Sequence, residues 1–113
     1  MKRIDAIIRS ERLAEVAAQL AARQLAGFTI TDVRGHGSSV EQQGEWRGLP
    51  YELSVTHKLL ITLFVEEDEL AAALDAISTG ASTGQVGDGL ISVSEVAAMY
   101  RISPTNGAPA ADA

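Results

Sequence analysis

The residues with the clearest potential for chemistry are 83–89, which read TGQVGDG and lead directly into Leu90, Ile91 and Ser92. Successive backbone N–H groups in a glycine-rich turn form a concavity that binds anions, and glycine tolerates the positive φ angles that such turns need. No lysine or arginine lies within this segment or immediately after it. The pattern therefore predicts an anion site whose positive charge comes from elsewhere. The alternative is an ordinary turn between a helix and a strand.

Other residue patterns give little support for catalysis or metal binding. The chain has no cysteine, which excludes disulfides, thiolate metal sites and thiol catalysis. His36 and His57 have no second histidine three or four residues away, so no metal site is expected within one chain. A site shared across a subunit interface, with the two histidines meeting each other or Glu41, is the alternative. No Ser-His-Asp spacing, Walker lysine or acid-base pair indicates turnover, and we predict no catalytic function.

Length and charge limit the class of protein. A chain of 113 residues is expected to form one domain, and its net charge of -6 argues against nucleic acid and anionic membranes as general partners. Its apolar runs are too short to cross a bilayer, and residues 1–5 lack the apolar region of a signal peptide. We therefore expect a cytoplasmic protein without membrane insertion.

The hydrophobic pattern predicts a β-α-β-β-α-β order. The expected elements are a strand over Lys2–Arg9, a helix over Glu11–Leu25, strands over Phe28–Arg34 and Lys58–Val65, a helix over Asp68–Ser78, a strand over Leu90–Val96, and a short helix or strand over Ala97–Ile102. We expect Ser10 to cap the first helix and Gly27 to end it. This order is typical of the ferredoxin-like α+β fold, a four-stranded antiparallel sheet with both helices on one face.

Apolar side chains are expected on both faces of the sheet. Ile7 and Ile8 point to opposite faces of the first strand, as Leu60 and Ile61 do on the third. The helices cover one face only, so we expect the other to pack in a homo-oligomer.

Residues 35–57 form a long polar connection with no sustained period. Connections of this length are uncommon in compact domains and are usually functional or mobile. Trp46, Leu49, Tyr51 and Leu53 offer contact side chains that a linker lacks. We predict a partner-binding loop, and a disordered hairpin tip is the alternative.

Six segments together resemble one family. These are KRIDAIIR at 2–9, VRGHG at 33–37, WRGLPY at 46–51, Lys58, TGQVGDG at 83–89, and YRI at 100–102. With this spacing, residues 1–103 resemble the PII signal-transduction superfamily, which includes nitrogen regulatory protein P-II, and residues 104–113 form a low-complexity tail expected to be disordered. The resemblance implies a homotrimer that binds adenine nucleotides in clefts between subunits. It also implies a T-loop, about residues 37–55, that regulates a partner such as a membrane transporter or a metabolic enzyme.

The resemblance also implies a set of nucleotide contacts, with a B-loop at about residues 82–90 that receives the phosphates. The implied nucleotide-binding residues are Ile7, Thr29, Gly35, His36, Gly37, Ser38, Thr62, Phe64, Gly87, Asp88, Gly89, Leu90 and Arg101. Arg101 would come from a neighbouring subunit, and Lys58 would bind a small-anion effector.

This chain departs from the family pattern mainly in its cations. Ser38 and Ser39 replace a basic residue and a glutamine, Leu90 replaces the lysine that closes the B-loop, and Ser103 replaces an arginine. Thr62 stands where an acidic residue commonly reads the adenine edge. Charge-assisted contacts to phosphate are worth on the order of 1.5–3 kcal/mol each. We therefore predict that ADP, AMP or a cyclic nucleotide is favoured over ATP, with Mg²⁺ bound only if ATP binds. These departures place the chain closer to divergent PII-like groups, some associated with bicarbonate uptake or carboxysomes and others with metal efflux.

Two alternatives remain. One is a standard nitrogen regulator that responds to MgATP and 2-oxoglutarate and is modified at Tyr51, a tyrosine that otherwise serves as an unmodified contact residue. The other is a trimeric metal-binding module resembling the CutA proteins, without nucleotide binding.

Overall fold

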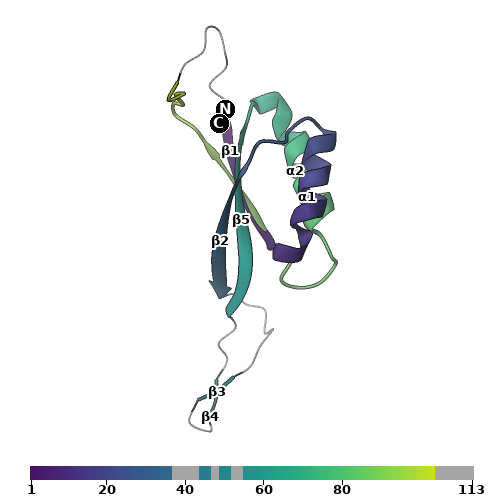
Figure 1. Ribbon diagram of the computed structural model, residues 1–113, viewed down its shortest axis with the longest axis vertical. Helices are drawn as coiled ribbons and strands as arrows, with labels where there is room; N and C mark the ends of the chain where they lie inside the picture. Colours follow the sequence, from purple (N-terminus) through teal and green to yellow (C-terminus); the bar gives the residue numbers. More distant parts are fainter. Residues whose placement is uncertain (37–43, 47–48, 52–54, 104–113) are drawn as a thin grey trace.

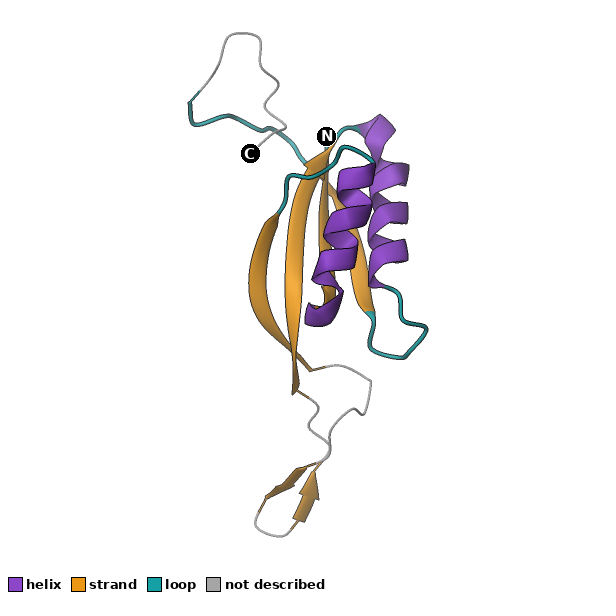
Figure 2. Ribbon diagram, turned by 45° about the vertical axis from the view of Figure 1, so that its right-hand side comes forward, coloured by secondary structure: helices purple, strands orange, loops and turns teal. Residues whose placement is uncertain are grey.

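Four strands form one antiparallel sheet, and two helices cover one of its faces (Figures 1 and 2). The strands are β1 (Lys2–Arg9), β2 (Thr29–His36), β5 (Val55–Val65) and β6 (Gly89–Glu95), in the order β2-β5-β1-β6. Short 3₁₀ turns, η1 (Ser10–Arg12) and η2 (Glu67–Glu69), lead into helices α1 (Leu13–Ala22) and α2 (Leu70–Ala81). This is the ferredoxin-like arrangement that the sequence predicts. The computed structural model describes residues 1–36, 44–46, 49–51 and 55–103.

The core lies between the sheet and the two helices. Alternate residues of the two central strands point toward the helices, and the buried apolar residues are Ile4, Ala6, Ile8, Leu59, Ile61, Leu63 and Val65 from the strands and Val16, Leu20, Ala73, Ala76, Ile77 and Ala81 from the helices. The helices approach closely at Gly80, where a Cβ atom would lie 2.7 Å from the Cα of Val16.

The ends of α1 differ from the prediction. Ser10 is not a helix cap, because it lies in η1, where the structure has no side-chain cap, and its hydroxyl faces the Glu11 carboxylate at 3.4 Å. The helix ends at Ala22, five residues before Gly27. Gln24 adopts the left-handed conformation instead, with φ 62°, the one positive φ at a non-glycine residue in the described part of the chain.

The end of α1 is a Schellman motif, which glycine usually completes. Gln24 N–H donates to the carbonyl of Ala21 at 3.0 Å, and Leu25 N–H donates to that of Leu20 at 2.9 Å. Glutamine has no preference for the left-handed conformation. The sequence pattern therefore predicted the end of the helix at the next glycine, Gly27.

The predicted strands and the second helix are present, most of them with shifted ends. A capping box between Glu66 and Glu69 starts the second helical segment, and α2 continues to Ala81, beyond the predicted end at Ser78. β5 begins at Val55 instead of Lys58 and lies in the middle of the sheet beside β1. Residues 97–102 form neither a helix nor a strand, so that prediction is wrong.

The connection between β2 and β5 is shorter than predicted and contains regular structure. β2 continues to His36, and the short strands β3 (Gly44–Trp46) and β4 (Leu49–Tyr51) pair with each other. The prediction of a connection without regular structure is therefore wrong for these strands. The predictions for Gly37, Ser38, the tail 104–113 and the side chain of Tyr51 concern parts of the chain outside those that the structure describes.

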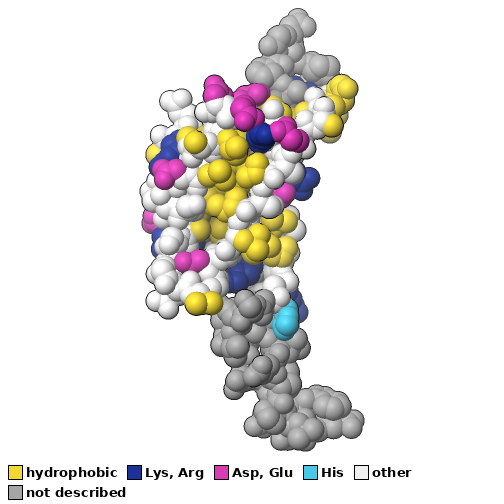
Figure 3. Space-filling model, turned by 180° about the vertical axis from the view of Figure 1, so that it is seen from behind, with side chains coloured by type: hydrophobic (Ala, Val, Ile, Leu, Met, Phe, Trp, Pro, Cys, Tyr) yellow, Lys and Arg dark blue, Asp and Glu magenta, His cyan; other side chains and the backbone are white. Residues whose placement is uncertain are grey.

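The sheet face opposite the helices, called the open face below, carries its side chains in rows across the strands. The strand registers place a polar row (Thr29, Thr62, Asp5, Ser92), a mainly apolar row (Thr31, Leu60, Ile7, Leu90) and a row with two cations (Val33, Lys58, Arg9). Figure 3 views the molecule from behind, with the helices on the left and the open face on the right, and hydrophobic side chains gather along its middle. Apolar residues on both faces are confirmed, and the homotrimer stays a prediction.

Candidate functional site

The B-loop, residues 82–90, connects α2 to β6 and is organised around the carboxylate of Asp88. That carboxylate accepts hydrogen bonds from the backbone N–H groups of Thr83 at 2.8 Å and Gly84 at 3.1 Å, from the Thr83 hydroxyl, and from Arg9 Nε at 3.0 Å. These bonds, those from Thr83 first, hold the pKa of Asp88 far below its ordinary value of 3.8. The anion that the first half of this loop binds is therefore the loop's own carboxylate.

The loop has the backbone that its glycines predict. Gly84, Gly87 and Gly89 have φ values of 80°, 95° and 117°, a region that side chains disfavour. Gly89 also packs directly on β1, where a Cβ atom would lie 1.7 Å from the carbonyl oxygen of Ile7. Glycine is thus required at position 89 both by its φ angle and by the adjacent strand.

Two cations from neighbouring strands lie against this loop. Arg9 donates from a second guanidinium nitrogen to the carbonyl of Val86 at 2.8 Å, and Lys58 Nζ donates to the carbonyl of Gly87 at 2.6 Å. Arg9 and Lys58 face each other across β1 and β5, and Lys58 is 8% exposed. Arg9 and Lys58 therefore supply positive charge next to the loop.

Sequence reasoning did not select Arg9. The residue closes the first strand 77 positions before Val86, and the signal that could have found it is its alternation with Ile7 on β1. Its placement opposite Lys58 depends on the β1–β5 register, which strand prediction alone does not provide.

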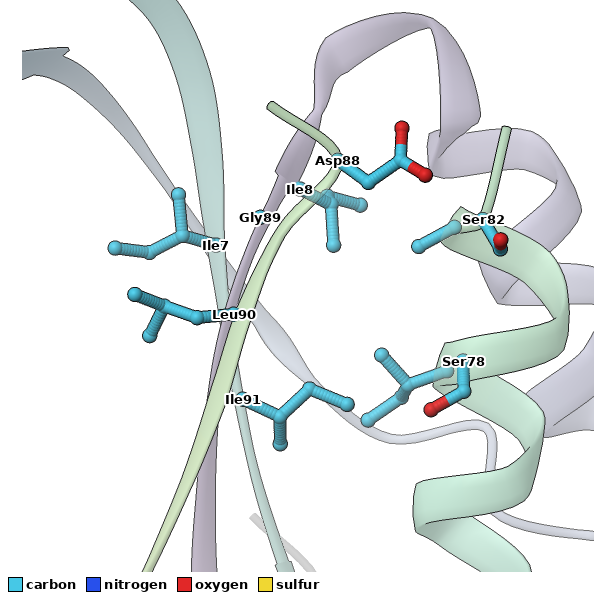
Figure 4. A pocket seen from close by; sticks show the side chains of 10 residues that line it. Ile7, Ile8, Ser78, Ser82, Asp88, Gly89, Leu90 and Ile91 are labelled. Carbon is cyan, nitrogen blue, oxygen red and sulfur yellow. The ribbon is translucent and has the colours of Figure 1, made fainter. Parts of the chain in front are cut away.

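A small cavity of about 180 Å³ lies between β6 and the C-terminal half of α2, next to the B-loop (Figure 4). Ile8, Ile91, Ser78, Ser82 and Asp88 lie on the helix side of the strands. Ile7 and Leu90 also border the cavity but point to the opposite side, onto the open face (Figure 4).

A larger cavity of about 620 Å³ lies at the start of β2. Its lining residues come from the α1–β2 connection and from the end of β5, and they are Gln24, Leu25, Ala26, Gly27, Phe28, Thr29, Thr62, Leu63, Phe64, Val65 and Glu69. Its size is within the range of about 300–1,000 Å³ for small-molecule sites. Three predicted nucleotide contacts, Thr29, Thr62 and Phe64, thus line one cavity.

Both threonine hydroxyls in this cavity already donate hydrogen bonds. Thr62 Oγ1 donates to Asp5 at 2.7 Å, and Thr29 Oγ1 donates to the Thr62 carbonyl at 3.3 Å. Burial raises the pKa of Asp5, but the bonds from Thr62 and Arg3 outweigh it, so that the net shift of the pKa is downward. The Asp5 carboxylate, which lies on β1 next to Thr62, is therefore ionised.

The predicted contacts form two groups within one chain. Ile7, Gly87, Asp88, Gly89 and Leu90 lie at the B-loop, whereas Thr29, Thr62 and Phe64 lie at the larger cavity. On β1, the partners of Gly89 and Thr62 are Ile8 and Asp5, three residues apart, or roughly 10 Å.

The remaining predicted residues line neither cavity. Gly35 lies on β2 opposite Thr56 and beside Lys58, and His36 is exposed where β2 ends. Arg101 lies in the segment after β6. His57 contacts Asp32 at 3.0 Å, and within the described ranges no three or more metal-ligating side chains come together. No helix in the described part of the chain is long and apolar enough to cross a membrane.

Comparison with known proteins identifies the family. The family described as "Nitrogen regulatory protein P-II" matches residues 1–106. Nitrogen regulatory protein P-II of Microchaete diplosiphon is 36% identical over 102 residues, which are 90% of this chain and 91% of that protein. Nitrogen regulatory protein P-II 2 of Methanothermobacter thermautotrophicus is 37% identical over 90% of this chain and 89% of its own length. Nitrogen regulatory protein P-II 1 of Escherichia coli K12 is 37% identical over 90% of this chain and 91% of its own length. The chain therefore belongs to the nitrogen regulatory protein P-II family of signalling proteins.

Proposed function

We propose that this protein is a non-catalytic sensor of an adenine nucleotide with few phosphates, and that AMP, ADP or a cyclic form is favoured over ATP. It acts as a homotrimer in which the B-loop of one subunit and the larger cavity of another form each cleft. The T-loop, residues 37–55, reports the ligand state to a partner protein of carbon or nitrogen metabolism or transport, and Tyr51 is a contact residue within it. Family membership supports the sensor role and the soluble cytoplasmic location.

Family membership is the basis for the cleft between subunits. Within one chain the predicted contacts form two groups, roughly 10 Å apart along β1 and on different strands. In the proposed trimer, each group would face the other group of a neighbouring chain.

The charges at the B-loop carry the preference for fewer phosphates. Arg9 and Lys58 donate hydrogen bonds to the described B-loop, and both are engaged by the loop's own oxygen atoms. The Asp88 carboxylate adds a negative charge at the same point. Leu90, which is 61% exposed on the open face beside Ile7, leaves an apolar group at the position of the usual cation. The site therefore has too little free positive charge to balance a triphosphate. A nucleotide with fewer phosphates needs less positive charge.

Calorimetric titration with ATP, ADP, AMP and cyclic AMP tests the proposal, with and without Mg²⁺, bicarbonate and 2-oxoglutarate. We expect AMP or ADP to bind at least tenfold more tightly than ATP, one per chain, to a particle of threefold mass by light scattering. The Leu90→Lys variant serves as the matched comparison. It restores one cation on the open face and should strengthen ATP binding by about tenfold or more, with a smaller gain for AMP.

Two outcomes would contradict the proposal in different ways. Tight MgATP binding that strengthens with 2-oxoglutarate, together with modification of Tyr51 in cells, would identify a standard nitrogen regulator. Binding of no nucleotide, with a metal-dependent rise in melting temperature, would favour the metal module.

A further inference from the structure

Gln24 combines two features: it occupies the left-handed position of a Schellman motif, where glycine is usual, and it borders the larger cavity. Its φ of 62° is unfavourable for a side chain by about 1 kcal/mol relative to glycine. Such a residue is retained where the surroundings or a function require it. Gln24 is also one of the residues that line the larger cavity, with Leu25, Gly27 and Thr29.

Among the polar side chains of this cavity, Gln24 has the amide available for a ligand. Thr29 and Thr62 donate their hydroxyl protons to the Thr62 carbonyl and to Asp5, and Glu69 accepts the N–H of Glu66 at 2.9 Å. For the Gln24 amide, the described part of the chain contains no hydrogen-bond partner. A primary amide presents one acceptor and two donor protons at a fixed distance from each other.

We propose that the Gln24 side chain reads the adenine base in the larger cavity, with its oxygen accepting from the 6-amino group and its nitrogen donating to N7. This pair matches the bidentate contact that glutamine makes with adenine. The inference rests on the proposed function, because it requires a nucleotide whose base enters this cavity. It assigns recognition of the base to the α1–β2 connection. Across the cavity, Thr62 on β5 lacks the carboxylate that is common at this position in the family.

The base would lie against apolar surface while its edge meets Gln24. Phe28, Leu63 and Phe64 contribute to the cavity wall, and such sites combine apolar walls with a few polar groups that fix orientation. Gln24 follows directly from α1 through the Schellman hydrogen bonds, so its backbone is fixed before ligand binding. The left-handed conformation thus holds Gln24 in a fixed place beside the cavity.

The test combines a change in the protein with a change in the ligand. AMP and purine riboside 5′-monophosphate, which lacks only the 6-amino group, are titrated into wild type and Gln24→Gly. In wild type, loss of the amino group should weaken binding about fivefold, and Gln24→Gly should weaken AMP binding about tenfold. In Gln24→Gly, loss of the amino group should have less than about a twofold effect, because its partner is already gone.

Stability provides the internal control. Glycine is preferred at this backbone conformation, so Gln24→Gly should melt at the same temperature as wild type or higher. A variant that binds more weakly while being at least as stable excludes general unfolding as the cause.

The failures are distinguishable. If wild type binds AMP but loss of the amino group weakens binding equally in both proteins, Gln24 does not read the base and the proposed function stands. The same conclusion follows if Gln24→Gly binds AMP as wild type does. If wild type binds no nucleotide, the proposed function fails, and this inference fails with it.

Discussion

Gly89→Ala is expected to lower the free energy of unfolding by about 3 kcal/mol or more, a large part of the total stability of a small domain. The new Cβ atom would lie 1.7 Å from the Ile7 carbonyl oxygen, and the φ of 117° disfavours any side chain. Relief requires β6 to move away from β1, which disrupts the pairing of Ile8 with Gly89 and of Ile7 with Leu90. Urea denaturation of both proteins measures the difference.

Gly84→Ala is the matched control for this prediction. Gly84 belongs to the same loop and has a φ of 80°, but a Cβ atom there would meet nothing within 4 Å. Only the conformational cost of about 1–2 kcal/mol is then expected. Equal losses of stability in the two variants would show that the packing of Gly89 on β1 contributes nothing beyond its φ angle.

Asp88→Asn is expected to have the largest pH-dependent effect on stability. The folded protein holds the pKa of Asp88 well below 3.8, because the ionised carboxylate accepts bonds from Thr83, Gly84 and Arg9. With a depressed folded pKa, this stabilisation is complete above the ordinary value of 3.8 and declines as the pH falls from there toward the folded pKa. The neutral asparagine retains one acceptor oxygen and places an NH₂ group where donors converge.

Urea midpoints measured at pH 7, 4, 3 and 2 in wild type and Asp88→Asn test this account. The wild type should be clearly more stable at pH 7, and the difference should remain to about pH 4 and shrink below it. Other carboxylates are common to both proteins, so the difference isolates position 88. A difference independent of pH would show that the charge of Asp88 does not organise the B-loop.

The fold was predictable from the sequence where one pattern determined both the element and its burial. Alternating apolar residues predict β1 and β5, and the same side chains, Ile4, Ile8, Ile61 and Leu63, form the core. Predictions failed where the backbone departs from the usual residue preferences. Gln24 follows α1 in place of a glycine, 3₁₀ turns precede both helices, and α2 extends to Ala81 through Gly80, which packs against Val16.

The candidate site was predictable in its backbone and less so in its electrostatics. The glycines at 84, 87 and 89 indicate positive φ angles, and the structure confirms them. The pairing of Asp88 with Arg9 joins residues 79 positions apart and depends on the strand registers, which no local pattern contains. Gln24 was not predicted as a site residue for a similar reason. Its place beside the cavity depends on how the α1–β2 connection lies against β5, which no local sequence pattern contains.

The affinity ratio of ATP to AMP for the wild-type protein, measured by calorimetry in the presence of Mg²⁺, tests the central claim most directly. The pairing of Arg9 and Lys58 with the loop's own oxygen atoms, and Leu90 at the end of the loop, predict that AMP binds at least tenfold more tightly. ATP binding as tight as or tighter than that of AMP would contradict the account.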